Sequence, residues 1–169
     1  PPPKALEELI APSILPVWYR LTDVPLPEFT SIPAMVVKWQ IPIFFSDDTG
    51  GAYASYAMNS QNCNTEPGEV RVSSKLWNNY SLDEISATMA HELYHAYQML
   101  EKGYSCGCTQ EKELESLIVE LGVLKLLGRD DILDAKWSGA WDSNGDFRLD
   151  WLWEAISETY SSCPKYEPR

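Results

Sequence analysis

The stretch SLDEISATMAHELYHAYQML, residues 81–100, predicts a long amphipathic helix that carries both histidines of the chain. Ser81 and Glu84 form a capping-box pattern, in which two side chains satisfy backbone N–H groups at the start of a helix. Gly103 is the expected C-terminal stop. Apolar residues recur near a period of 3.6, at Leu82, Ile85, Met89, Leu93, Ala96 and Leu100. The motif HELYH, residues 91–95, is therefore expected in the middle of the helix.

Histidines four residues apart on a helix lie on one face, so His91 and His95 can direct imidazole nitrogens to one point. Neutral imidazole is a favoured ligand of Zn²⁺. Glu92 is rotated by about 100° from His91, where it can approach a water in an open position of the metal and act as general base. The alternative is that both histidines are surface or core-edge residues without a ligand. We favour a zinc site that activates water, because H-E-x-x-H on a helix presents two zinc ligands and one general base together.

A second helix is expected over residues 109–127, and it carries the candidates for a third metal ligand. Its apolar face is expected to comprise Leu114, Leu117, Ile118, Leu121 and Leu124. On a helical wheel, Glu111 and Glu115 share one flank of that face, whereas Glu113 and Glu120 share the other. Helical spacing alone therefore does not choose among these four glutamates.

The motif HELYH, preceded by a strand and followed by a glutamate-bearing helix, resembles the zincin metallopeptidases. Residues 105–109 offer no third histidine, so the resemblance is to the gluzincin branch, in which a glutamate on the next helix completes the metal site. SATMAHELYHAYQML followed by KELESL also resembles small metallopeptidase domains of uncharacterised substrate. The resemblance covers about residues 50–127.

This resemblance implies residue roles and a fold. The metal ligands would be His91, His95 and Glu115, the last chosen from an E-x-E-small pattern at 113–116, with Glu92 as general base. A tyrosine would stabilise the oxyanion, and the available ones are Tyr94, Tyr97, Tyr104 and Tyr160. The expected fold is α+β and zincin-like, with a small, largely antiparallel sheet packed on the HExxH helix and a second helix bearing a ligand.

The expected activity is zinc-dependent hydrolysis of peptide bonds. One alternative is a catalytically inactive metal-binding or protein-binding domain derived from a metallopeptidase. Another is a secreted binding module held by disulfides, in which the histidines are incidental. Substitution of Glu92 and analysis of bound metal separate these three hypotheses.

The rest of the chain is expected to form an N-terminal arm, residues 1–45, and a single domain, residues 46–169. Nine of the twelve prolines lie in the first 42 residues, so the arm should contain only short elements packed on the body. The segments 52–58 and 69–74 predict an antiparallel pair of strands around a long loop. Further elements are expected as a short helix at 4–10, strands at 34–39 and 41–45, and helices at 130–137 and 151–161.

The chain carries 13 basic and 25 acidic side chains, which gives a formal net charge of −12. This charge repels phosphate backbones and anionic lipids, so we expect no nucleic acid and no membrane surface as partners. No apolar run approaches the roughly 18 residues that span a bilayer, and the first residues lack a signal-peptide pattern. A peptide or protein substrate remains as the expected partner, and the oligomeric state is left open.

Four cysteines, at positions 63, 106, 108 and 163, fit either two disulfides or reduced, half-buried thiols. Cys106 and Cys108 form C-x-C without a second pair, which excludes a zinc ribbon. Paired cysteines would favour an extracytoplasmic location. The sequence alone leaves the pairing and the compartment open.

The stretch DSNGD, residues 142–146, offers oxygen ligands at the first positions of a calcium loop. The pattern then fails, because Phe147 stands where the loop needs glycine and Trp153 where it needs glutamate. Asn144-Gly145 is also the commonest pair of a type I′ hairpin turn. We therefore favour a turn over a calcium site.

Overall fold

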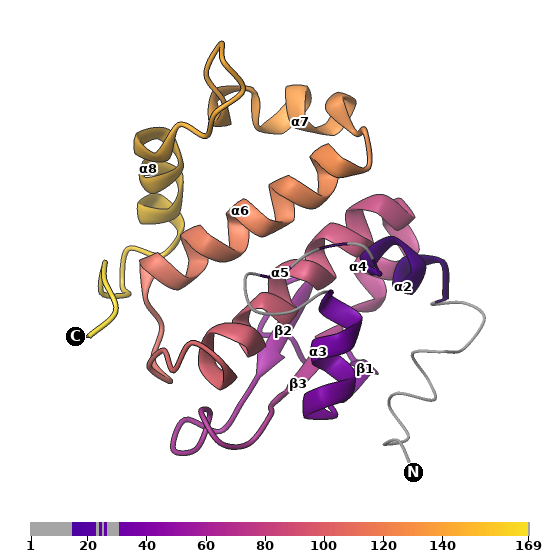
Figure 1. Ribbon diagram of the computed structural model, residues 1–169, viewed down its shortest axis with the longest axis vertical. Coiled ribbons are helices and arrows are strands. Elements are labelled where there is room, and N and C mark those ends of the chain that lie inside the picture. The colour runs from indigo at the N-terminus through magenta and orange to yellow at the C-terminus, as the bar shows by residue number, and fades with distance from the viewer. Residues whose placement is uncertain (1–14, 23, 25, 27–30, 169) are drawn as a thin grey trace.

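The computed structural model describes residues 15–22, 24, 26 and 31–168, which form an α+β fold (Figure 1). The fold class is as expected. The elements in chain order are α2 (Leu15–Leu21), α3 (Ile32–Trp39), β1 (Ile43–Phe45), β2 (Ala54–Ala57), β3 (Glu69–Val72), α4 (Ser74–Asn79), α5 (Leu82–Leu100), α6 (Gln110–Leu126), α7 (Asp130–Lys136), a 3₁₀ turn (Ser138–Ala140) and α8 (Leu149–Thr159). The helix expected at 4–10 lies outside the described residues.

The three-stranded sheet has the order β1-β3-β2. The expected antiparallel pair is confirmed, with Tyr56 of β2 opposite Val70 of β3. On the other edge of β3, β1 runs parallel, with Ile43 opposite Val70. The sheet is therefore mixed and not largely antiparallel. The chain reverses direction once between β1 and β2 and again between β2 and β3, so β1 and β3 run parallel. Strand β3 lies between the two earlier strands.

The strand expected over residues 34–39 is wrong, because this segment belongs to helix α3. Ser31 caps the helix, and its hydroxyl accepts a hydrogen bond from the Ala34 N–H at 3.3 Å. Gln40 ends it in the left-handed conformation, with φ of 52°. The apolar run looks strand-like, but Val36 is fully buried whereas Val37 is 62% exposed, as a helix with one buried face requires.

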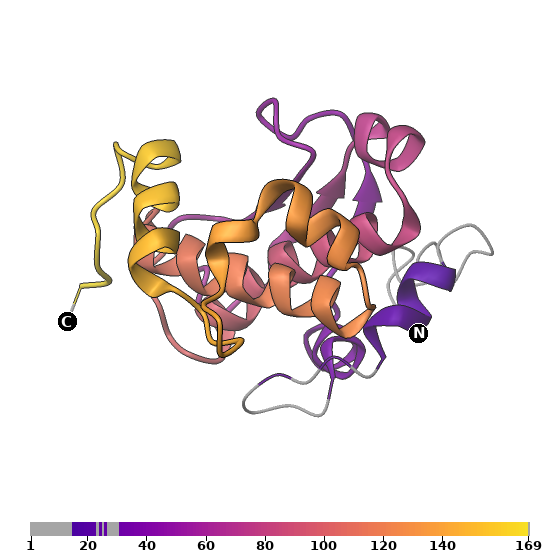
Figure 2. The ribbon, with the colours of Figure 1, turned by 90° about the horizontal axis from the view of Figure 1, so that it is seen from above.

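Helix α5 lies at the centre of the fold and begins at the expected capping box. The Ser81 hydroxyl accepts from the Glu84 N–H at 3.2 Å, and the Glu84 carboxylate accepts from the Ser81 N–H at 3.4 Å. The sheet packs on one side of α5. Helices α2 and α3 pack on another side, and α6 runs beside α5 (Figure 2). The expected helices at 109–127, 130–137 and 151–161 are confirmed as α6, α7 and α8.

Helix α2 joins this core through buried apolar side chains and one ion pair. Val17 and Leu21 are fully buried. Arg20 forms a 2.5 Å ion pair with Asp83 in the first turn of α5. Asp83 also pairs with Arg129, which precedes α7, at 3.0 Å. This carboxylate therefore ties together segments that are far apart in the sequence.

Two disulfides hold the loops around the connection between α5 and α6. Cys63 pairs with Cys106, and Cys108 pairs with Cys163. The first bond attaches the β2–β3 loop to this connection, and the second attaches the segment that follows α8. All four cysteines are thus oxidised, which resolves the alternative that the sequence left open.

Residues 142–146 form the expected hairpin turn, between paired Trp141 and Phe147. The Asp142 carboxylate accepts from the backbone N–H groups of Asn144 and Asp146, at 2.8 and 3.0 Å. Gly145 has a φ of 83°, whereas Asn144 is not in the left-handed region. The turn is therefore not type I′, which needs positive φ at both central residues. The Asp142 carboxylate therefore stabilises the turn by accepting these backbone hydrogen bonds.

Candidate metal centre

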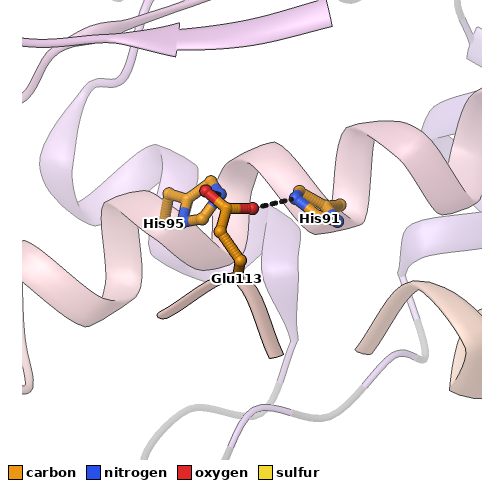
Figure 3. Close-up of side chains that lie close together, drawn as sticks. All are labelled: His91, His95 and Glu113. Carbon is orange, nitrogen blue, oxygen red and sulfur yellow. Dashed lines mark hydrogen bonds and ion pairs between the residues drawn. The ribbon is translucent and has the colours of Figure 1, made fainter. Parts of the chain in front are cut away.

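His91 and His95 lie one turn apart on α5 and face α6. Their ring centroids are 5.0 Å apart, and their side chains are only 13% and 11% exposed. The carboxylate of Glu113, from α6, lies between the two rings (Figure 3). Its Oε2 is 3.3 Å from His91 Nε2, and its Oε1 is 3.3 Å from His95 Nε2. These three residues form a group that could hold a metal ion.

The structure brings Glu113, and not the favoured Glu115, to the two histidines. The Glu115 carboxylate instead accepts from Lys102 Nζ at 3.0 Å and from the Tyr104 hydroxyl at 2.7 Å. The two glutamates therefore have different partners at the end of α5 and beyond it. The E-x-E-small pattern contains both glutamates and carries no information on which of them reaches the histidines.

The two remaining candidates have other positions. Glu120 shares the flank of Glu113, and its Oε1 is 3.2 Å from His91 Nδ1, the ring nitrogen that faces away from Glu113. Glu111 accepts from the backbone N–H of Glu167 at 2.7 Å and so anchors the C-terminal segment. Glu120 is thus an outer partner of His91, and Glu111 supports the fold.

The donor set fits a divalent cation. The three donor atoms lie within 4.8 Å of one another. Ligand atoms about 2.05 Å from a tetrahedral ion are separated by roughly 3.3 Å. Each imidazole Nε2 lies 3.3 Å from one of the two Glu113 oxygens, which is close to that separation. Two imidazoles and one carboxylate are a common set of protein ligands for a catalytic metal.

The outer nitrogen of His95 has partners that fix its tautomer. Gln98 donates its side-chain amide to the Lys112 carbonyl and to Glu115 Oε2, both at 3.0 Å. Its Oε1 must then face His95 Nδ1, at 3.0 Å, and accept a hydrogen from it. With the hydrogen on Nδ1, His95 Nε2 offers its lone pair to the centre. No sequence pattern pointed to Gln98, although it stands three residues after His95 and acts as an outer partner of it.

The electrostatics of the site also favour a cation. Burial alone would lower the pKa of His91, but hydrogen bonds to Glu113 and Glu120 raise this pKa well above its usual value. Burial alone would raise the pKa of Glu113, but the two histidines bring it far below its usual range. The carboxylates of Glu113, Glu120 and Glu92 thus surround two imidazoles, and positive charge is stabilised there.

Glu92 is half-buried and follows His91 directly. Burial raises the pKa of this carboxyl above its ordinary value, although the two histidines oppose the shift. A carboxylate with a raised pKa is a stronger proton acceptor. The charges of His91 and His95 therefore act on Glu92, and its carboxylate can accept a proton as a general base does.

Of the four tyrosines considered from the sequence, Tyr160 interacts with the centre. It follows α8, and the Glu113 carboxylate influences its hydroxyl. Burial and the Glu113 charge raise the pKa of Tyr160 far above its usual value, so the hydroxyl keeps its proton and remains a donor. Tyr94 and Tyr97 pack against each other, with ring centroids 5.2 Å apart, and Tyr104 donates to Glu115.

Comparisons of the chain with family models, with curated proteins and with solved structures find no match. Among the described residues, no helix has the length and apolar character needed to cross a membrane.

Proposed function

We propose that this chain is a zinc-dependent peptidase in which His91, His95 and Glu113 bind Zn²⁺ and Glu92 is the general base. The observation that carries this proposal is the Glu113 carboxylate, which lies 3.3 Å from the Nε2 atoms of both histidines. Three protein ligands from imidazole and carboxylate, with a fourth position left for water, are typical of catalytic zinc.

A zinc ion in this centre would lower the pKa of water and polarise the substrate carbonyl. Glu92 would take the proton from the attacking water and pass it to the leaving amine, and the raised pKa of its carboxyl supports this role. Tyr160 would donate its hydroxyl hydrogen to the oxygen on which negative charge develops. Each of these groups belongs to α5, α6 or the end of α8, so packed helices hold the constellation.

The two disulfides favour an oxidising compartment, because cytosolic thiols are kept reduced. We therefore propose that the chain acts outside the cytoplasm on peptides or proteins. The net charge of −12 disfavours nucleic acid and anionic membranes as partners.

The test combines metal analysis with peptide cleavage. We expect one zinc per chain in the wild type and in Glu92→Gln, and none in His91→Ala. Glu92→Gln should lower kcat by roughly 10²–10⁴-fold, because it removes the proton acceptor and keeps the shape of the side chain. If the wild type binds zinc but cleaves no member of a mixed peptide library, the chain is instead a non-catalytic metal-binding domain.

A further inference from the structure

A cavity of about 160 Å³ begins beside the candidate metal centre. Glu120 lines this cavity, and its Oε1 is 3.2 Å from His91 Nδ1. Thr88, which lies three residues before His91 on α5, lines it as well. The cavity therefore extends from the Glu120 side of His91 to Glu84 near the start of α5.

The walls of the cavity are mainly apolar and aromatic. Leu76 from α4, Leu124 from α6 and Ile132 from α7 contribute aliphatic surface. The rings of Tyr80 and Trp137 also line it. Such walls suit a long side chain with a methylene stem, and aromatic faces attract a cation at its end.

The charged groups in the lining are Glu84, Glu120 and Lys136, which leaves an excess of one negative charge. Glu120 stands at the metal end. Glu84 stands seven residues before His91, or roughly 10 Å away along the helix axis. Lys136 is exposed, and its Nζ lies 5.9 Å from the centre of the Tyr80 ring, so a cation is already accommodated against this wall. Glu84 Oε1 accepts from the Ser81 N–H and hydroxyl, and Glu120 Oε1 lies beside His91, so a cationic side chain would add to the partners of these carboxylates.

On the basis of the peptidase activity proposed above, we propose that this cavity binds the side chain of an arginine or lysine next to the scissile bond. The stem lies against the apolar walls, and the cationic end pairs with Glu84. The net charge of −12 attracts basic peptides to the protein from a distance.

Two substitutions change the charge of the cavity in opposite directions. Glu84→Gln removes the negative charge at its far end, and glutamine still completes a capping box, so α5 keeps its start. Lys136→Met removes the competing cation and keeps an unbranched stem. Glu154→Gln, at an exposed position of α8, is the matched control for loss of one negative charge.

The probe is a fluorescein-labelled, alanine-rich octapeptide with arginine, lysine, leucine or glutamate at one central position. Its binding to the Glu92→Gln protein is measured by fluorescence anisotropy, and its cleavage by the wild type is measured by kcat/KM. We expect the arginine and lysine peptides to bind best. Glu84→Gln should weaken them about fivefold, Lys136→Met should tighten them, and Glu154→Gln should change neither. The affinity of the leucine peptide should not change in any of the three variants.

Binding and cleavage distinguish this inference from the peptidase proposal. If the leucine peptide is preferred, or if Glu84→Gln leaves the arginine peptide unchanged, the basic specificity is wrong even when cleavage occurs. If the arginine peptide binds with the expected dependence on Glu84 but is never cleaved, the cavity is a site for basic side chains and the peptidase proposal fails. If none of the peptides binds, the inference fails.

Discussion

The side-chain amide of Gln98 donates to the carboxylate of Glu115 across the interface of α5 and α6, with 3.0 Å between Nε2 and Oε2. This contact decides which end of the amide faces His95. Glu115 therefore contacts Gln98, the partner of His95, and not the histidines themselves. The residue favoured by the sequence pattern and the residue that touches both histidines have different contacts, although they stand two positions apart.

This difference gives the first prediction. Glu113→Gln should remove a charged ligand and weaken zinc binding by more than 100-fold, whereas Glu115→Gln should weaken it by about 10-fold or less, as for an outer partner. Competition with a chromophoric chelator measures both affinities. Equal losses in the two variants would mean that the ligands are assigned wrongly.

Gln98 offers a second prediction, which depends on the histidine tautomer. Gln98→Leu should lower zinc affinity by roughly 10–100-fold, because the His95 Nδ1 hydrogen loses its acceptor and the hydrogen is no longer confined to that nitrogen. The ¹⁵N chemical shifts of His95 in the metal-free protein report the tautomer directly. An unchanged pattern of shifts in Gln98→Leu would show that Ser116, 3.2 Å from the same nitrogen, suffices alone.

Tyr160→Phe tests the proposed oxyanion donor. Removal of the hydroxyl should lower kcat by roughly 10²-fold, since a single preorganised donor contributes about that much, while KM and zinc content stay nearly constant. Steady-state kinetics with metal analysis separate these quantities. A loss of zinc in Tyr160→Phe would indicate that the hydroxyl chiefly holds Glu113 in place.

The pH dependence of the metal-free protein follows from His91. Its pKa is raised on folding, so its protonation stabilises the fold fully below the unfolded value of about 6.5. This stabilisation is lost as the pH rises through the raised pKa of the folded state. We expect urea unfolding in the presence of a chelator to show stability falling above neutral pH, and His91→Gln to remove that fall.

The disulfide between Cys108 and Cys163 closes a loop of 55 residues. Replacement of both cysteines by serine should lower the free energy of unfolding by about 4 kcal/mol, because the unfolded chain regains the entropy of that loop. Urea unfolding with and without reductant measures the effect. A double variant as stable as the wild type would show that the backbone bond from the Gln110 N–H to the Pro164 carbonyl holds this segment by itself.

The sequence predicted those elements whose signals are local. The capping box at Ser81 and the 3.6-residue period that follows it fix α5, and with it the shared face of His91 and His95. Helix α3 was missed because consecutive valines favour strands, whereas Ser31 and the packing of Val36 against the core decide for a helix. In α3, tertiary packing therefore outweighs the local preference of the valines for a strand.

The glutamate that reaches the histidines could not be predicted for a different reason. It depends on how the apolar faces of two helices pack, and a wheel of one helix does not contain that angle. Glu113 and Glu115 stand in the same short pattern, but Glu113 lies beside the histidines and Glu115 contacts Gln98, Lys102 and Tyr104. Tyr160 was one of four candidate tyrosines, and the sequence could not select it because α8, which it follows, begins 36 residues after Glu113.

Anomalous diffraction at the zinc edge, from crystals grown with zinc, tests the proposed ligands of the metal. We expect one strong peak between the two histidines, about 2.0–2.1 Å from each Nε2 and about 2.0–2.2 Å from a carboxylate oxygen of Glu113. A peak at Glu115, or no peak between the imidazole rings at full zinc loading, would contradict this proposal.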